Sequence, residues 1–221
     1  MEQEKKLKRA STEESKEIRK RSILNAGMEL FLSNPTELPT VSAISKHCNI
    51  AKGTIYIYFK TKEEIFLNII DDLFNQFVET THSIILSAKS DSTSCNSKIE
   101  FIVNKWCDYY AENSMMVMLA GMSNNIIENN IDIEAAAEHK KSLQKQVLSL
   151  GETLSEVIDK DNLFCASLLI RSYAITIGIS RISNLPSKVR MAHKDGAEFI
   201  APEFRSELFS TLLPFWKGSL V

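Results

Sequence analysis

The residues best suited to chemistry lie close together, between Thr40 and Phe66. Lysine, threonine and tyrosine side chains donate hydrogen bonds to phosphate oxygens and base edges, and a glycine among them lets a backbone approach its ligand closely. Seven residues among those of these types are the candidates for DNA contact: Thr40, Lys52, Gly53, Thr54, Tyr56, Tyr58 and Lys62. Such a mixture of small, aromatic and basic residues suits a helix that lies against double-stranded DNA. It predicts a sequence-specific DNA-binding protein.

Charged residues are unevenly distributed along the 221-residue chain, whose net charge is only -2. Residues 1–62 hold 12 Lys and Arg against 7 Asp and Glu, whereas the remaining 159 residues hold 14 against 21. A basic end on an acidic remainder is expected when one end faces phosphate. A solvated lysine-rich tail would give the same distribution, so the charge supports the DNA prediction only together with the motif.

The sequence carries no arrangement typical of an enzyme or a metal site. The four cysteines, Cys48, Cys95, Cys107 and Cys165, form no C-x-x-C pair, and the four histidines are scattered. No phosphate-binding loop and no pairing of a nucleophile with a base is visible. We therefore predict no catalytic residues, no metal ion and no cofactor.

Two stretches of the sequence predict the cellular compartment of the protein. The start, MEQEKKLKRA, is polar and unlike a signal peptide, which favours a cytoplasmic protein with reduced thiols. The apolar run Leu163–Ser180 is nearly long enough for a membrane span, but Arg171 and several Ser and Thr interrupt it. A buried helix is the better interpretation, and we predict no membrane segment.

The elements that must position the motif begin with a polar segment. Residues 1–14 are predicted to be a flexible basic arm, either solvated or following a DNA groove. The apolar residues of the next segment repeat at helical spacing and predict a helix over Ser15–Ser33. Asn34 and Pro35 should end it.

Two short helices joined by a tight turn should follow. Thr40 is a good N-cap, because its hydroxyl can accept a hydrogen bond from a free backbone N–H. Asn49 stands where the turn requires a residue that tolerates positive φ. The third helix is predicted over Lys52–Phe59, with Ile55 and Phe59 facing inward.

The remaining helices are predicted from caps and apolar spacing. Thr61 and Glu64 form a capping box that opens a long helix ending near Leu86. A loop over Lys89–Asn96 precedes a second capping box at Ser97–Glu100, and the helix that follows should break near Asn113. Further helices are expected at Ile133–Ile158, Leu163–Leu185 and Glu203–Trp216, with Pro214 loosening the end of the last one and a long loop over Pro186–Pro202.

These elements predict an all-α fold of about nine helices with no convincing strand. Residues 15–61 form a three-helix helix-turn-helix DNA-binding domain. Residues 62–221 form a larger all-helical domain, which we call the body. We expect the body to bind an effector and to dimerise.

The stretch KGTIYIYFKTKEEIF, residues 52–66, closely resembles the signature of TetR-family (TetR/AcrR-like) transcriptional regulators. The upstream helix with Ile23, Leu24, Ala26 and Phe31 is similar to the first helix of that family, and the resemblance is specific over about residues 18–70. It implies a three-helix DNA-binding domain on an all-α body that binds a small molecule. The family usually dimerises through its last two long helices, here Leu163–Leu185 and Glu203–Trp216.

The chain departs from the family pattern at three positions. Asn49 replaces the turn glycine, which is physically compatible. Ala51 replaces the usual Ser or Thr at the start of the recognition helix and is a poor cap, leaving backbone amides for a phosphate oxygen. Ile57 replaces the usual His or Tyr, so that only an apolar contact to a thymine methyl remains there.

Each motif residue has an expected role on DNA. Lys52 is the best candidate for reading a base edge, and Thr54 can reach a base or a phosphate. Tyr56 and Tyr58 place a hydroxyl at phosphate distance, although Tyr56 could instead belong to the core. Lys62 and Thr40 are expected at phosphates, Gly53 allows close approach, and Lys60 is expected to be merely solvated.

The body is predicted to hold the dimer interface and an effector site. A three-helix unit reads few base pairs, so a homodimer on a near-palindromic operator is expected. The apolar helix Leu163–Leu185 suits that interface, or a place in the centre of the monomer. The tentative pocket residues are adaptable or flat, and core packing explains each equally well; they are Trp106, Tyr109, Tyr110, Met115, Met116, Met118, Met122 and Arg171. Arg171 is expected to pair with an internal carboxylate, and His139 to be solvated.

The leading functional hypothesis is a repressor released from its operator by a small, largely apolar ligand. An alternative is a DNA-binding dimer without a small-molecule effector, acting as an activator or as a partner-regulated architectural protein. Thiol sensing through Cys95 is weakly supported, since the nearest following basic residue is Lys98. An enzyme is the least supported interpretation.

Overall fold

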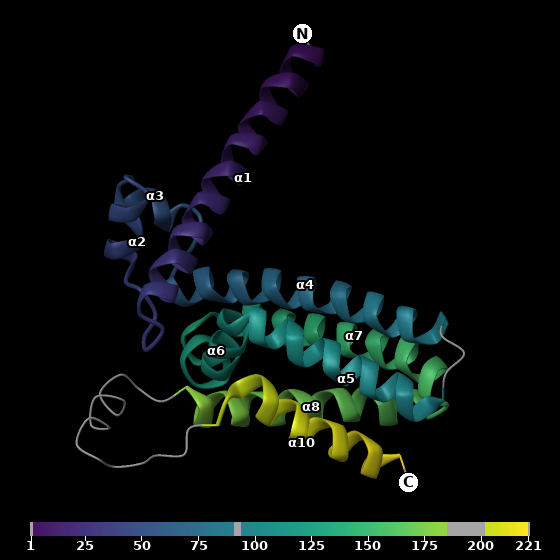
Figure 1. The fold of residues 1–221 in the computed structure, drawn as a ribbon. Helices are drawn as coiled ribbons and strands as arrows, with labels where there is room; N and C mark the ends of the chain where they lie inside the picture. The colour runs from purple at the N-terminus through teal and green to yellow at the C-terminus, as the bar shows by residue number, and fades with distance from the viewer. Residues whose placement is uncertain (1, 91–93, 185–201, 221) are drawn as a thin grey trace, which may run out of the picture. The chain divides into compact units, whose positions relative to one another are not determined.

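A computed structural model describes residues 2–90, 94–184 and 202–220; the side chains of residues 2–12, 124 and 125 are outside this description. The described residues form nine α-helices and no strand, which confirms the all-α prediction (Figure 1). The helices are α1 (Glu2–Ser33), α2 (Val41–His47), α3 (Lys52–Tyr56), α4 (Lys62–Ser90), α5 (Cys95–Glu112), α6 (Ser114–Met122), α7 (Ile133–Ile158), α8 (Asn162–Ser183) and α10 (Phe204–Ser219). A π-helical turn (Ser123–Ile127) and a 3-10 turn (Glu128–Asn130) follow α6.

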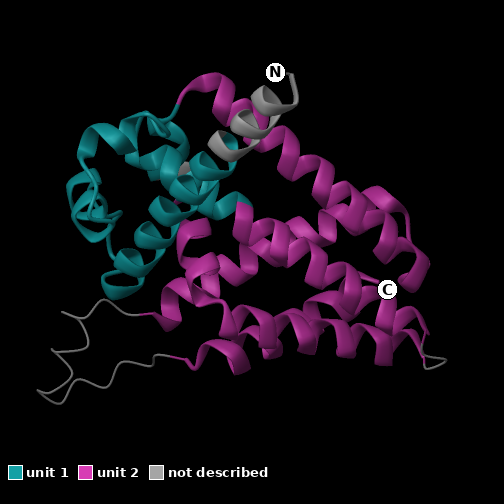
Figure 2. Cartoon of the chain, turned by 90° about the horizontal axis from the view of Figure 1, so that it is seen from above, with its two compact units in different colours: residues 1–71, 123–131 teal, residues 72–122, 132–221 magenta. Residues whose placement is uncertain are grey.

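The chain folds into two compact units, which Figure 2 draws in different colours. Unit 1 comprises Met1–Asp71 and Ser123–Ile131, and unit 2 comprises Asp72–Met122 and Asp132–Val221. The division falls inside α4, later in the chain than the predicted boundary after residue 61. Unit 1 therefore contains the predicted DNA-binding helices together with the start of α4.

Unit 1 is held by an apolar core at the junction of its helices. Phe31 of α1 and Phe66 of α4 are buried with their ring centroids 5.9 Å apart. A Cβ on Gly27 would lie 3.3 Å from Cδ1 of Ile69, so α1 and the start of α4 pack closely. Ile44 of α2 and Ile55 of α3 are fully buried and fix the two short helices on this core.

The caps of unit 1 follow the sequence prediction. Thr40 Oγ1 accepts a hydrogen bond from the Ala43 N–H at 3.2 Å, and Asn49 adopts a φ of 53° in the turn. Thr61 Oγ1 accepts from the Glu64 N–H at 3.1 Å, while Glu64 reaches back to the Lys60 N–H at 2.6 Å. This reciprocal cap fixes where α4 begins, directly after the recognition helix.

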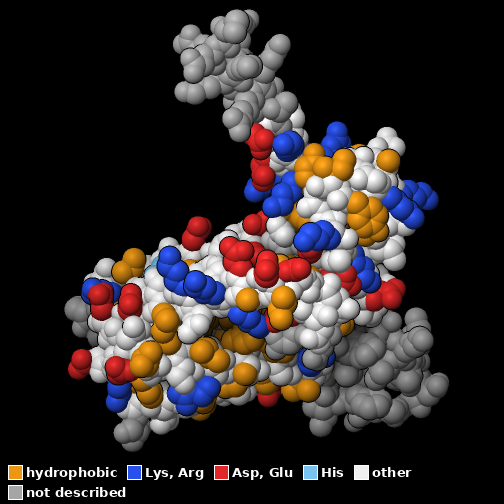
Figure 3. All heavy atoms as spheres, turned by 180° about the vertical axis from the view of Figure 1, so that it is seen from behind, with side chains coloured by type: hydrophobic (Ala, Val, Ile, Leu, Met, Phe, Trp, Pro, Cys, Tyr) orange, Lys and Arg blue, Asp and Glu red, His pale blue; other side chains and the backbone are white. Residues whose placement is uncertain are grey.

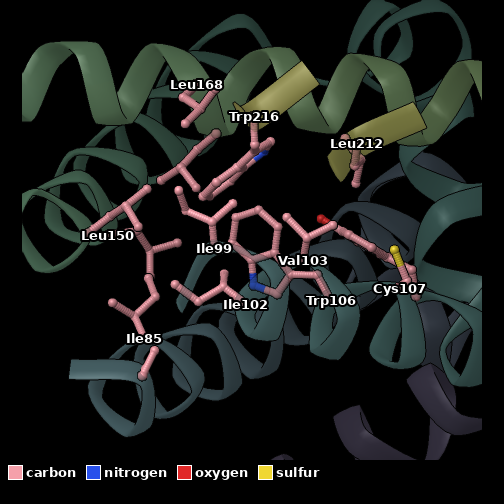
Figure 4. Close-up of a cluster of buried hydrophobic side chains, with 14 of the residues drawn as sticks. Ile85, Ile99, Ile102, Val103, Trp106, Cys107, Leu150, Leu168, Leu212 and Trp216 are labelled. Atoms are coloured by element: carbon pink, nitrogen blue, oxygen red, sulfur yellow. The ribbon is translucent and has the colours of Figure 1, made fainter. Parts of the chain in front are cut away.

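Unit 2 is a helical bundle around two tryptophans (Figure 4). Trp106 of α5 and Trp216 of α10 pack edge to face with ring centroids 5.2 Å apart. The Trp216 Nε1–H donates to Ser172 Oγ of α8 at 2.8 Å, and α7 packs against both α8 and α5. Arg205 Nη2 donates to Asp108 Oδ1 at 2.7 Å and to Asn104 Oδ1 at 2.7 Å, joining the start of α10 to α5.

Several element boundaries differ from prediction. Helix α1 begins at Glu2 instead of Ser15, because residues 2–14 are mostly good helix formers without Gly or Pro. Helix α5 is capped by Ser94, whose hydroxyl accepts from the Ser97 N–H at 3.3 Å, so the predicted capping box at Ser97 was wrong. Pro214 does not end α10, which continues to Ser219.

Helices α4 and α8 end close to their predicted limits. Helix α4 extends to Ser90, one turn beyond Leu86, and α8 ends at Ser183. Helix α7 covers Ile133–Ile158, as predicted. Of the predicted loop Pro186–Pro202, residues 186–201 lie outside the described residues.

Helix α8 is long and apolar enough, by length and composition, to cross a membrane. The same helix packs against α7, α10 and α6 within unit 2, and its Cys165, Leu168 and Leu169 belong to the core. Apolar core helices pass such a test for the same reason, since they too lack a wholly polar face.

Candidate DNA-binding surface and effector region

Helix α3 has one exposed face and one buried face. Lys52, Gly53, Tyr56 and Ile57 are exposed, and their spacing places them on one side of the helix, whereas Ile55 is fully buried. Tyr56 is 54% and Ile57 79% exposed, so Tyr56 is not a core residue. The buried face fixes the orientation of α3, and the exposed face is available to a partner outside the fold.

Gly53 stands on this exposed face without a structural reason to be glycine. A Cβ at this position would meet no atom within 4 Å, and the residue is helical, with φ outside the left-handed region. An exposed helical glycine is less favourable than alanine by roughly 0.5–1 kcal/mol. Packing within the protein does not demand this residue, which favours a role in contact with a ligand.

The other predicted DNA-binding residues flank this face. Thr54 and Tyr58 are partly exposed, and Lys62, at the start of α4, has its Nζ 3.9 Å from Glu63 Oε1. Thr40 is exposed and caps α2. Four of the seven predicted residues therefore share α3, and two more follow at the α3–α4 junction. Ala51 makes no side-chain cap hydrogen bond, as its apolar side chain requires.

The described surface of unit 1 carries charged side chains with apolar side chains between them. In Figure 3, hydrophobic side chains on the smaller unit lie directly beside Lys and Arg side chains. Lys20 Nζ lies 5.8 Å from the ring centroid of Phe59, and His47 Nε2 lies 2.7 Å from Glu29 Oε2. Cationic groups beside flat or branched apolar groups suit a phosphate backbone with base edges between its strands.

The predicted effector residues of unit 2 divide into core and margin. Trp106, Tyr110 and Met116 are buried, whereas Tyr109, Met115, Met118 and Met122 are partly exposed. Phe77 of α4 lies against these rings, with its centroid 5.2 Å from that of Tyr110 and 6.1 Å from that of Trp106. Burial raises the pKa of the hydroxyls of Tyr109 and Tyr110, and both stay protonated at neutral pH.

Two buried polar atoms near this aromatic group have no hydrogen-bond partner within the described structure. They are Trp106 Nε1 and Thr81 Oγ1, and Thr81 lies one turn after Phe77 on α4. A buried donor without an acceptor costs about 1–3 kcal/mol. Sequence patterns gave no indication of Thr81, because threonine within an amphipathic helix is usually unremarkable.

Two predictions for single residues in the body were wrong. Arg171 is exposed; its Nε–H donates to the Ser167 carbonyl, and its guanidinium lies over the rings of Phe164 and Phe215. These rings stand where an internal carboxylate was expected. His139 is buried, with 4% of its surface exposed, because it lies about three helical turns before the core residue Leu150 and so on the same face of α7.

The exposed side of α8 is a stripe of apolar and small residues. Its members recur at helical spacing and are Leu163, Ser167, Ile170, Ala174, Gly178 and Ile182. The exposed residues of α10 are also small, namely Ser206, Ser210, Pro214 and Gly218. Hydrophobic side chains gather along the lower edge of the molecule in Figure 3, where α8 and α10 lie in Figure 1. The α10 stripe was missed in the sequence, although its spacing of four residues was visible.

Two segments of the sequence, which together cover most of the chain, match models of one protein family. Residues 77–221 match the family described as "Tetracyclin repressor-like, C-terminal domain". Residues 23–69 match "Bacterial regulatory proteins, tetR family". Together the two models cover the recognition helix and most of unit 2.

Named relatives are similar over shorter stretches. The chain is 30% identical over 83 residues to the fatty acid metabolism regulator protein of Bacillus subtilis, which is 38% of this chain and 41% of that protein. It is 38% identical over 58 residues to the uncharacterised HTH-type transcriptional regulator YhgD of the same organism, 26% of this chain and 30% of that protein. The chain thus matches less than half the length of these relatives.

Solved structures share the fold over nearly the whole chain. A putative TetR-family transcriptional regulator from Mesorhizobium loti superposes with a TM-score of 0.61 at 13% identity, covering 91% of this chain and 94% of that one. The regulator FadR from Bacillus subtilis, solved in complex with stearoyl-CoA, superposes with a TM-score of 0.51 at 18% identity, covering 87% and 97%. At these identities the likeness shows a common fold.

Proposed function

This chain belongs to the TetR family of bacterial regulatory proteins, and we propose that it is a repressor that a small, largely apolar ligand releases from a near-palindromic operator. As a member of that family it is a DNA-binding transcriptional regulator. The repressor sign, the operator symmetry and the ligand are the parts that we propose.

The observation that carries the proposal is the exposed face of α3. Lys52, Tyr56 and Ile57 leave the fold there with no role in its core, and Gly53 keeps the backbone bare. In this proposal Lys52 donates to guanine O6 and N7, while Tyr58 and Lys62 hold phosphates. The net positive charge of residues 1–62 supports the same partner.

A homodimer through α8 and α10 is the second part of the proposal. The α8 stripe is apolar yet exposed, and Gly178 has open space where a Cβ would stand. Small residues on both helices would let two copies approach closely, as they must in a bundle of four helices. Two copies also double the number of base pairs read, which a single three-helix unit requires for specificity.

An effector in unit 2 is the third part. The unpartnered Trp106 Nε1–H would donate a hydrogen bond to a polar group of a ligand, and Thr81 Oγ1 could donate to that group or accept from it, while the remainder of the ligand lies among aromatic and methionine side chains. Helix α4 runs without interruption from the recognition helix into unit 2. A ligand that prefers one arrangement of unit 2 would change DNA affinity by its differential affinity for the two states.

Selection of bound DNA from a random pool tests the DNA-binding part. We expect the wild-type protein to enrich a near-palindrome. Lys52→Ala should relax one position in each half-site, by ~1–3 kcal/mol if Lys52 contacts a base with two hydrogen bonds. Tyr58→Phe and Lys62→Ala should weaken binding to all sequences alike. Lys60→Ala is the matched control and should leave the enriched sequence unchanged. A pool without enrichment would contradict specific reading.

Release from the selected operator tests the effector part. Stearoyl-CoA is a suitable first probe, because the Bacillus subtilis regulator of the same fold was solved in complex with it. We expect this probe to lower the affinity for the operator and to quench tryptophan fluorescence, whereas coenzyme A without an acyl chain should do neither.

The alternative is a DNA-binding dimer without a small-molecule effector. The close packing of Phe77, Trp106 and Tyr110 favours it, since these rings occupy the centre of unit 2 themselves. Unchanged operator binding across acyl and other apolar probes would move this alternative to first place.

A further inference from the structure

Among the described side chains of unit 1, Ile57 is the most exposed large apolar one, with 79% of its surface accessible. It follows the last residue of α3 as its C-cap, so it contributes nothing to the core that Ile55 fills from the opposite side. An exposed β-branched residue gains no burial on folding. Its apolar surface is therefore available only to a partner outside this chain.

Gly53 lies one helical turn before Ile57, on the same face. Side chains on a helix lean toward its N-terminus, so the Ile57 side chain leans toward the bare backbone of Gly53. A Cβ at Gly53 would meet no atom within 4 Å, which means that Ile57 does not fill that space itself. We call the open space over the bare backbone of Gly53, beside the exposed Ile57 side chain, the slot.

We propose that this slot receives the C5-methyl group of a thymine in each half-site of the operator. The proposal rests on the proposed function as a DNA-binding regulator and adds the base that the slot distinguishes. The thymine methyl is the apolar group that base pairs present in the major groove; the other edge groups there are hydrogen-bond donors and acceptors. Ile57 can offer neither, so its contact discriminates through burial of that methyl.

The surroundings of the slot favour DNA over a protein partner. Lys52 is exposed on the same face of α3, and Lys60 and Lys62 follow within the next few residues. The slot is thus flanked by cations, as a surface facing a polyanion requires. An apolar protein partner would instead be expected to cover Tyr56 and Ile57 with few cations at the centre of its interface.

The test replaces thymine by deoxyuracil, one thymine at a time, in the operator that selection yields. Deoxyuracil lacks only the C5-methyl group and pairs with adenine in the same way. We expect one thymine in each half-site to be sensitive, with affinity falling about fourfold per half-site, the factor that burial of one methyl-sized group gives. Dissociation constants are measured by fluorescence anisotropy at several salt concentrations, because lower salt keeps weak variants measurable.

Three variants identify the residue that reads the methyl. Ile57→Ala should bind thymine and deoxyuracil operators equally, since nothing then covers the methyl. Gly53→Ala should bind the deoxyuracil operator as well as, or better than, the thymine operator, because the added Cβ occupies the slot. Ile133→Ala is the matched control: Ile133 is 82% exposed and lies at the start of α7, so this variant should keep the wild-type ratio.

Each outcome decides between the possibilities. An unchanged thymine-to-uracil ratio in Ile57→Ala would overturn the inference, as would a wild-type protein that binds every deoxyuracil operator with full affinity. In both cases the selected operator would leave the proposed function intact. A wild-type protein that selects no sequence would instead overturn the proposed function and this inference with it.

Discussion

At Gly53, a single substitution should affect folding stability and DNA binding in opposite directions. Because its Cβ position is open and its backbone helical, Gly53→Ala should raise the free energy of unfolding, by up to about 1 kcal/mol. The same change should weaken operator binding. Urea unfolding and fluorescence anisotropy measure the two effects. Ile133→Ala, at an exposed position of α7 outside the proposed DNA-binding and dimer surfaces, is the control and should leave DNA affinity unchanged.

The four cysteines should differ sharply in reactivity. Burial raises the pKa of the Cys107 thiol to about 12 and that of Cys165 to about 11, from an ordinary value of 9.0. Cys95 is exposed at the start of α5. Iodoacetamide at pH 8 should therefore modify Cys95 first and reach Cys107 and Cys165 only after unfolding, which peptide mass spectrometry can follow.

The same pKa shifts predict how stability depends on alkaline pH. A thiol whose pKa is raised by folding stabilises the protein fully below its unfolded pKa, and this contribution is lost as pH rises toward the folded pKa. For Cys107 the loss falls between about pH 9 and about pH 12. Loss of operator binding after modification of Cys95 alone would favour thiol sensing through Cys95.

Residue roles could be predicted where local chemistry alone decides them. The cap of Thr40 and the positive φ of Asn49 depend only on neighbouring backbone, and both are present as expected. Arg171 and His139 depend on which side of a long helix meets the core. Arg171 stands in a largely apolar helix and His139 among charged neighbours, so local composition favoured the wrong environment for each.

Gly151, unlike Gly53, is required by the close packing of two helices. A Cβ at Gly151 would lie 2.9 Å from the Asn162 carbonyl oxygen and 3.0 Å from the Ala166 nitrogen, both backbone atoms of α8. Because backbone cannot rotate away, Gly151→Ala should push α7 and α8 apart and destabilise the protein by about 1–3 kcal/mol. Urea unfolding measures this effect, and an unchanged midpoint would show that the two helices are not in close contact.

Element boundaries were predictable where one signal stood alone. Helix α7 has an acidic cap at Asp132 and a clear apolar period, and it begins and ends at the predicted residues. At the start of α5, Ser94 and Ser97 are both good caps, and the sequence does not say which one the tertiary structure uses. Pro214 stays inside α10 because it is exposed there and the helix gains from packing on α5 and α8.

At the scale of the molecule, the sequence predicted two parts but not which segments make up each part. Unit 1 contains residues 123–131 as well as the N-terminal helices, so the chain passes between the units three times. Contacts between segments so distant in sequence leave no periodic pattern. Tyr173 Oη and Arg181 Nη2 of α8 donate to the carbonyls of Ala120 and Gly121, directly before that segment. These bonds satisfy carbonyls that the end of α6 would otherwise leave free.

The exposed stripe of α8 gives the last prediction, since a whole dimer depends on it. Ile170 lies near the middle of the stripe and is 57% exposed in the single chain. If two copies pair through α8 and α10, Ile170→Glu buries a carboxylate without a partner, and dimerisation should weaken by about 2–5 kcal/mol. Sedimentation should then show monomers, and operator affinity should fall because each DNA-binding unit binds alone. Ile133→Glu, at a still more exposed position of α7 (82%), should change neither property. A dimer that survives Ile170→Glu with full operator affinity would place the interface elsewhere, and the apolar stripe would need another partner.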